Sequence, residues 1–159
     1  MTHVPLKELP EFVRNVRAVL AMRPHYPRAA IIALVGELGA GKTSFVQEFA
    51  KQAGVEDIVQ SPTYVLMKTY EMPARRSERG AERWFERIVH IDAYRLEKPE
   101  EFDALRPDTF LKDPHALVLI EWPERIEEKL PMPDVVLHFS ADGMGPDERN
   151  IEMEAKDAG

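Results

Sequence analysis

The sequence lacks cysteine and any long apolar run. Without thiols, a chain of 159 residues has neither disulfide bonds nor thiolate metal sites. No stretch approaches the roughly 18 consecutive apolar residues that a membrane-spanning helix needs, and residues 1–10 lack the apolar core of a secretory signal peptide. We therefore expect a cytoplasmic protein without membrane contact.

A net positive charge is also missing. Lysine and arginine number 21 against 28 aspartate and glutamate residues, which gives a formal net charge of −7. Such a domain is poorly suited to binding nucleic acid through its own field, so a connection with RNA or DNA is expected to run through a protein partner. A hydrophobic content of 44% and a charged content of 31% are typical of a globular protein. The length predicts a single domain that covers residues 1–159.

The most informative motif is a complete phosphate-binding P-loop, which reads GELGAGKT over residues 36–43. It follows the apolar run Ala30 to Val35 and precedes the helix-like stretch Ser44 to Ala53, which is the strand–loop–helix context that the motif requires. The glycines let backbone N–H groups turn toward an anion, and the start of the helix adds partial positive charge. Lys42 is placed to reach the β- and γ-phosphates, and the Thr43 hydroxyl to hold Mg²⁺. The sequence therefore predicts binding of a nucleoside triphosphate.

Apolar patterning predicts further elements around the P-loop. We expect an amphipathic helix over Leu6–Met22, a strand over Tyr64–Tyr70 after the turn at residues 61–63, a loop over Pro73–Arg87, and a helical stretch near Pro99–Leu105. A P-loop strand joined to helices and strands predicts a three-layer α/β P-loop NTPase domain. Short polar turns between the last strands predict a mixed parallel and antiparallel central sheet. The other expected strands are Ile88–Asp92, Leu117–Glu121, Val135–Phe139 and Asn150–Glu154.

Two of the predicted strands end in an acidic residue, Asp92 and Glu121. The carboxyl ends of strands in an open α/β sheet face the ligand crevice, and phosphoryl transfer depends on positioning and charge neutralisation. Each carboxylate is a candidate for the Mg²⁺ ion or its waters, and a solvated strand end or an N-cap is the alternative. Thr63 is placed to sense the γ-phosphate as a switch residue does, although its spacing alone favours an ordinary turn. His90 and Trp122 either reach the crevice or pack in the core.

Five arginines lie in the Pro73–Arg87 segment. They are interpreted as part of a solvated loop or, alternatively, as a lid that closes over phosphates in the manner of small-molecule kinases. An Asn-Lys-x-Asp motif for guanine is absent from the sequence, so adenine is the expected base. The arginines are Arg75, Arg76, Arg79, Arg83 and Arg87.

Four blocks that span most of the chain occur in a specific order: GELGAGKT from Gly36, SPTY from Ser61, HIDAYRL from His90 and EWPE from Glu121. Together they resemble the bacterial TsaE family, also called YjeE, the ATPase of tRNA threonylcarbamoyladenosine biosynthesis. The resemblance implies that ATP is bound with Mg²⁺ and slowly hydrolysed. It also implies that the protein works with TsaD and TsaB, which attach the threonylcarbamoyl group to an adenosine of tRNA. The ATPase would then reset the partner complex between turnovers and meet tRNA only indirectly through that complex.

The resemblance also implies roles for individual residues. Lys42 would contact the phosphates, and Asp92 would orient or activate the attacking water. Thr43 and Glu121 would hold Mg²⁺, while Thr63 becomes a catalytic switch residue close to the γ-phosphate. The nucleotide-binding residues implied are Glu37, Leu38, Gly39, Ala40, Gly41, Lys42, Thr43, Ser44 and Trp122.

Three features depart from the family pattern. Glu37 stands where Asp is the commoner family residue, Met72–Arg87 is longer than expected, and Leu6–Glu11 shows no clear adenine-contacting pattern. Two other functions remain open from the residues alone. A small-molecule kinase would use the same P-loop with an arginine lid, and a nucleotide-dependent binding module would change shape on ATP with hardly any hydrolysis.

Overall fold

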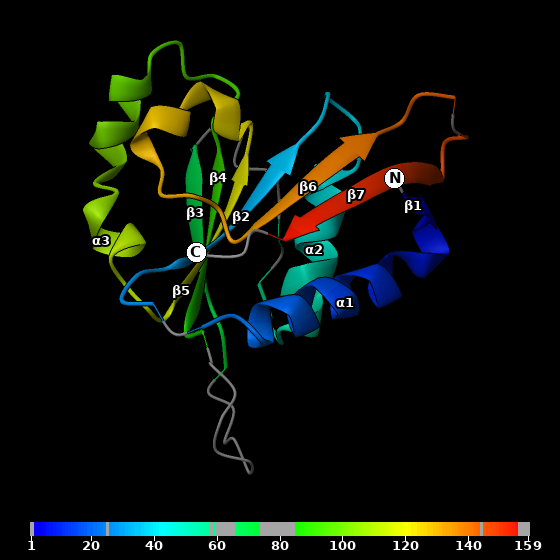
Figure 1. Ribbon diagram of the computed structural model, residues 1–159, viewed down its shortest axis with the longest axis horizontal. Helices are drawn as coiled ribbons and strands as arrows, with labels where there is room; N and C mark the ends of the chain where they lie inside the picture. The colour runs from blue at the N-terminus through cyan, green and yellow to red at the C-terminus, as the bar shows by residue number, and fades with distance from the viewer. Residues whose placement is uncertain are drawn as a thin grey trace.

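The fold is built on one mixed sheet, which the computed structural model describes over residues 2–24, 26–57, 59, 66–73, 85–143 and 145–155. Within these residues the sheet has seven strands in the order β1-β7-β6-β2-β5-β4-β3 (Figure 1). The strands are β1 (Thr2–Pro5), β2 (Ala30–Val35), β3 (Met67–Glu71), β4 (Arg87–Asp92), β5 (Ala116–Glu121), β6 (Val135–Ser140) and β7 (Glu148–Ala155). The helices are α1 (Leu9–Ala21), α2 (Lys42–Gln52) and α3 (Asp108–Leu111), with 3₁₀ helices η1 (Leu6–Glu8), η2 (Pro99–Leu105), η3 (Pro123–Arg125) and η4 (Glu127–Lys129).

Strand β2 lies at the centre of the sheet and carries the chain into the P-loop. Its neighbours β5 and β6 are both parallel to it, and β4 is parallel to β5. The outer strands β3, β7 and β1 pair antiparallel with their neighbours, which confirms the predicted mixed sheet. Because β2, β4 and β5 run in the same direction, their carboxyl ends meet at one edge of the sheet.

The central strands are covered on both faces. Helices α1 and α2 pack on one face, and η2 and α3 lie on the other, over β4 and β5 (Figure 1). In β2, Ile32 and Leu34 pack into the core with the first two helices, while Ile31 packs into the core on the opposite face. This burial on both faces explains why β2 is a continuous apolar run. The predicted three-layer arrangement is therefore present around the central strands.

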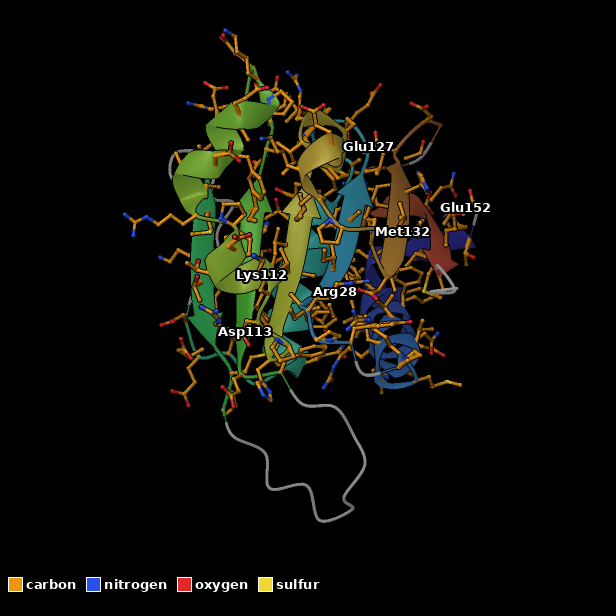
Figure 2. The ribbon with its side chains drawn as sticks, turned by 60° about the vertical axis from the view of Figure 1, so that its left-hand side comes forward. Arg28, Lys112, Asp113, Glu127, Met132 and Glu152 are labelled. Atoms are coloured by element: carbon orange, nitrogen blue, oxygen red, sulfur yellow. The ribbon has the colours of Figure 1, made fainter. Side chains whose placement is uncertain are left out.

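The outer half of the sheet has a more open face. A groove of about 810 Å³ lies over β2 and β6, on the face away from α1 and α2. Val35 and Val136 line it and are only half-buried. Figure 2 shows Met132 beside β6 and Glu127 near one end of the same face, and the Met132 side chain is exposed. The layer of η2 and α3 thus ends before it reaches β6.

Several elements differ from their predicted extent. The helix expected from Leu6 begins as η1, and α1 starts at Leu9 with Pro10 in its first turn, where the missing N–H of proline is tolerated. Helix α2 begins at Lys42 rather than Ser44. Strand β1 was not predicted, because its four residues form a strand only through pairing with β7. Of the helices that the structure describes, none has both the length and the apolarity that crossing a bilayer requires.

The predicted arginine-rich loop is wrong at its last residue. Arg87 is the first residue of β4, and its guanidinium donates to the Asp113 carboxylate at 2.8 and 3.1 Å and to the Thr109 carbonyl at 2.9 Å. Its hydrogen bonds therefore join β4 to α3, and they do not support a role in a lid over phosphates. The other four arginines and Thr63 lie outside the described residues.

Candidate nucleotide-binding site

The loop between β2 and α2 borders a cavity of about 290 Å³. Gly39 and Gly41 have φ angles of 74° and 105°, in the left-handed region that glycine adopts without strain. Gly41 is also the N-cap of α2, and it has no side chain that can bond the helix start. The first amide groups of a helix have no partner within the helix, so the start of α2 offers N–H donors to an anion.

Lys42 carries a buried positive charge beside the cavity. Its ammonium donates to the carbonyl oxygens of Gly36 and Glu37, the second at 2.7 Å. The side chain is buried, and this desolvation lowers the pKa of Lys42, while the nearby Glu121 and Asp92 carboxylates oppose the shift. The P-loop backbone therefore holds a cation in position next to the phosphate cradle.

The ends of β4 and β5 place two carboxylates side by side. Asp92 and Glu121 are direct partners in the parallel register and are only 5% and 3% exposed. The Thr43 hydroxyl donates to Glu121 Oε1 at 3.3 Å, so the two predicted metal ligands are in contact. Asp92 Oδ1 accepts the Tyr94 backbone N–H at 3.0 Å, which orients that carboxylate. Because two buried like charges repel each other, a cation between them is favoured.

Trp122 lines the cavity, whereas His90 lies beneath it. Trp122 follows β5 in a left-handed conformation, and its ring centre is 4.7 Å from the Lys42 ammonium and 5.0 Å from the Tyr94 ring centre. His90 is completely buried, with Nε2 at 3.6 Å from Glu121 Oε2. Neither ring nitrogen has a hydrogen-bond partner within the described chain. Trp122 thus lines the cavity and also packs against the apolar core, whereas His90 lies in the interior.

The structure gathers most of the expected site residues around one cavity, and two of the described ones do not line it. Ala40 is buried in the apolar core, and Glu37 contributes its backbone carbonyl to Lys42. In the described ranges, no group of three or more His, Cys, Asp or Glu side chains is placed to hold a metal ion. Mg²⁺ commonly takes one or two carboxylates together with phosphate oxygens and waters, and the pair Thr43 and Glu121 suits that mode.

Arg149 was missed by the sequence reasoning. It lies in β7 and lines the same cavity. A Cβ atom added to Gly41 would lie 3.3 Å from both Cγ and Nε of Arg149, so the arginine covers the P-loop closely. No local sequence motif identifies Arg149 as a site residue, because it reaches the P-loop only through the pairing of β7 with β6.

A smaller apolar pocket adjoins the cavity and was also missed. Its volume is about 90 Å³, and it shares Gly41, Ser44 and Arg149 with the larger cavity. Its remaining lining residues come from the N-terminal segment and from β6, β7 and the turn between them, so they lie far apart in the sequence. The apolar residues that line this pocket are Val4, Leu6, Leu9, Phe139, Pro146 and Ile151.

Comparisons with known proteins show which family the chain resembles. The family model described as "Threonylcarbamoyl adenosine biosynthesis protein TsaE" matches residues 7–151. The chain is 32% identical over 140 residues to the TsaE protein of Haemophilus influenzae, covering 87% of this chain and 78% of the relative. It is 34% identical over 128 residues to the TsaE protein of Bacillus subtilis, covering 79% and 69%. The crystal structure of YdiB from Bacillus subtilis is similar with a TM-score of 0.62 and 25% identity, covering 97% of this chain and 83% of that one.

Proposed function

The chain belongs to the TsaE family of threonylcarbamoyl adenosine biosynthesis proteins, and from this premise we propose that it is the ATP-hydrolysing component of that tRNA modification. The observation that carries the proposal is the contact between Thr43 and Glu121 next to the buried Lys42 ammonium. A metal-binding pair and a phosphate-binding cation at the start of a helix are the parts that phosphoryl transfer from ATP requires. The same premise supports TsaD and TsaB as its protein partners.

The residues present fit a nucleoside triphosphate with Mg²⁺. The uncapped start of α2 and the two left-handed glycines suit phosphate oxygens, and Lys42 suits the β- and γ-phosphates. Thr43 and Glu121 would hold Mg²⁺, which supplies positive charge that offsets the charge developing on the phosphate oxygens. The apolar pocket beside Ser44 suits an adenine ring.

Asp92 is the residue that we assign to the attacking water. Its carboxylate is buried, held by the Tyr94 N–H, and adjacent to Glu121. An oriented carboxylate positions the water and accepts its proton as the oxygen attacks the γ-phosphorus. The bond between the γ-phosphorus and the β–γ bridging oxygen breaks, which leaves ADP and inorganic phosphate. Lys42 stabilises the negative charge on the β- and γ-phosphate oxygens throughout the reaction.

The proposal is tested by measuring Mg-ATP hydrolysis by the purified chain, alone and with a TsaD–TsaB complex. We expect slow hydrolysis by the chain alone and a faster rate with the partners. Asp92→Ala is expected to lower kcat by about 100-fold or more, with the Kd for ATP little changed, because the aspartate acts on water rather than on the phosphates. Asp108→Ala, an exposed aspartate in α3, is the matched control and should leave both values unchanged.

Other outcomes would favour the alternative functions. ATP binding without turnover under either condition would contradict the hydrolytic role and indicate a nucleotide-dependent binding module. Transfer of phosphate to a small molecule, without stimulation by TsaD–TsaB, would indicate a kinase. Unchanged ATP affinity in Lys42→Ala would overturn the assignment of the phosphate cradle itself. No observation on the described residues favours the kinase, since Arg87 pairs with Asp113 instead of facing the cavity.

A further inference from the structure

His90 is a completely buried polar side chain in β4 that takes no direct part in the proposed reaction. Neither of its ring nitrogens has a hydrogen-bond partner within the described chain. A buried polar group that lacks a partner costs about 1–3 kcal/mol of stability, and an apolar side chain at the same place avoids this cost. Packing alone therefore gives no reason for a histidine at this position, and a hydrogen-bond partner has to come from a neighbouring side chain that moves.

The pairing of β4 with β5 directs the ring of His90 toward the Glu121 carboxylate. His90 and Asp92 are two residues apart in β4, so their side chains lie on the same face of the sheet. Glu121 is the register partner of Asp92 and shares that face. His90 Nε2 lies 3.6 Å from Glu121 Oε2. Because His90 is buried and does not line the cavity, it approaches the carboxylate from the interior of the protein.

The two carboxylate oxygens of Glu121 have different neighbours. Oε1 accepts the Thr43 hydroxyl at 3.3 Å, on the side of the P-loop, and Oε2 faces His90. Since Thr43 and Glu121 are the pair that suits Mg²⁺, Oε1 lies on the metal side, and Oε2 is available for a second interaction. Carboxylates that ligate a metal are themselves hydrogen-bonded, and these outer contacts fix their orientation. A shift of Oε2 by about 0.5 Å brings it within hydrogen-bonding distance of Nε2.

We infer that His90 is a positioning residue, which donates its Nε2–H to Glu121 Oε2 and thereby orients the carboxylate toward the Mg²⁺ site. It acts only through Glu121 and touches neither the nucleotide nor the metal. The inference rests on the proposed function, since it requires the metal ion that accompanies ATP.

Metal affinity is measured with Mn²⁺, which substitutes for Mg²⁺ and whose free ion has a distinct electron paramagnetic resonance signal. The Kd of Mn²⁺ is determined for the chain saturated with ADP, and the Kd of ADP is determined by calorimetry in EDTA. His90→Leu removes the donor and keeps an apolar side chain in its place. We expect it to raise the Kd of Mn²⁺ by about 10- to 100-fold, as for the loss of an outer contact of a metal ligand. The Kd of ADP in EDTA should change by less than about 3-fold, because His90 does not contact the nucleotide.

Two further variants separate the hydrogen bond from packing. His90→Gln carries an amide N–H donor on a side chain that reaches toward Glu121, so it should bind Mn²⁺ more tightly than His90→Leu. Val89 is the preceding residue of β4, is also buried, and packs into the core on the opposite face of the sheet. Val89→Ala is therefore the matched control, which should lower the thermal stability and leave the Kd of Mn²⁺ unchanged.

Four outcomes would count against the inference. An unchanged Kd of Mn²⁺ in His90→Leu would overturn it and leave the proposed function intact. Equal losses in His90→Leu and His90→Gln would overturn it too, because the shape of the ring rather than its donor would then matter. A parallel loss of affinity for Mn²⁺ and for ADP in EDTA would indicate a general distortion of the site. If the wild-type chain binds ADP but no Mn²⁺, the metal site of the proposed function fails, and this inference fails with it.

Nuclear magnetic resonance of the wild-type chain decides the question if His90→Leu does not fold. With Mg²⁺ and ADP added, the nitrogen chemical shifts of the His90 ring show which nitrogen carries the proton. A proton on Nε2 supports the inference, because that nitrogen faces Glu121. A proton on Nδ1 alone overturns it, since a bare Nε2 cannot donate a hydrogen bond.

Discussion

At the scale of residues, three buried charges determine the character of the cavity. Lys42 contributes one positive charge, and Asp92 and Glu121 contribute two negative charges; Glu121 contacts Thr43 of the P-loop, and both carboxylates act on the Lys42 ammonium electrostatically. Charges with so little exposure are retained only when they have partners. Lys42 is held by carbonyl oxygens, and Glu121 by the Thr43 hydroxyl. Asp92 and Glu121 are neighbours at the ends of β4 and β5, so the negative charge is concentrated at that side of the cavity and favours a divalent cation there.

Trp122 provides a direct signal for ligand binding. Its ring lies 4.7 Å from the Lys42 ammonium, so a phosphate that draws the ammonium away changes the environment of the indole. The sequence has 2 tryptophans, and Trp84→Phe leaves Trp122 as the only one. We expect the fluorescence of this variant to change saturably with Mg-ATP, and the change to be lost when Lys42→Ala is added. A fluorescence that does not respond, while calorimetry detects ATP binding, would contradict the placement of Trp122 beside the nucleotide.

At the scale of elements, the P-loop depends on how closely β2 and β6 approach each other. Gly36 directly follows β2, and a Cβ atom at this position would lie 2.6 Å from the Phe139 backbone oxygen and 3.0 Å from the Phe139 Cβ. Backbone atoms of a paired strand have little room to move aside. The first glycine of the motif is thus required by strand packing as well as by phosphate approach.

Gly36→Ala is therefore expected to lower the free energy of unfolding by about 1–3 kcal/mol and to weaken ATP binding as the loop shifts. Chemical denaturation monitored by circular dichroism measures the first effect, and calorimetry the second. Gly143→Ala is the control, because Gly143 also has a positive φ angle but has no neighbouring atom within 4 Å of the added Cβ. Equal destabilisation by the two substitutions would show that backbone strain alone, and not the contact with β6, determines the effect.

At the scale of the whole molecule, the acidic balance limits direct contact with RNA. A net charge of −7 opposes the binding of a phosphate backbone. We expect filter-binding assays at about 0.15 M salt to show no retention of tRNA by this chain alone, and retention only when TsaD and TsaB are added. Specific binding of tRNA by the isolated chain would contradict the indirect role. Asp108→Lys raises the net charge by two units at an exposed position in α3. Measuring tRNA retention by this variant alone tests whether net charge by itself determines tRNA binding.

The sequence predicts the local parts of this site well. The P-loop, β2, and the acids at the ends of β4 and β5 all follow from short patterns, because a glycine-rich turn, an apolar run and a terminal carboxylate are contiguous in the chain. The sequence also predicts that the P-loop and the two acids lie close together, since parallel strands bring their carboxyl ends to one edge of the sheet. The helical periodicity of Leu9, Val13 and Val16 likewise predicted α1, although Leu6–Glu8, which were expected to belong to the same helix, form the separate 3₁₀ helix η1.

The remaining parts depend on contacts between distant segments. Arg149 reaches the P-loop because β7 pairs with β6, and the register of that pairing is not visible in either strand alone. The apolar pocket joins residues from both ends of the described chain, so no window of sequence reveals it. Strand β1 has only four residues and too short a pattern to identify. The role of Thr63 stays a prediction, because it lies outside the described residues.

The pairing of β1 with β7 has a consequence for protein synthesis. The P-loop is translated before β7, the strand that lines the cavity with Arg149 and pairs with β1. Domains form during translation as their segments leave the ribosome. A nascent chain that lacks β7 therefore has its P-loop without this wall of the cavity, and tight capture of a nucleotide is postponed until β7 has been made and paired.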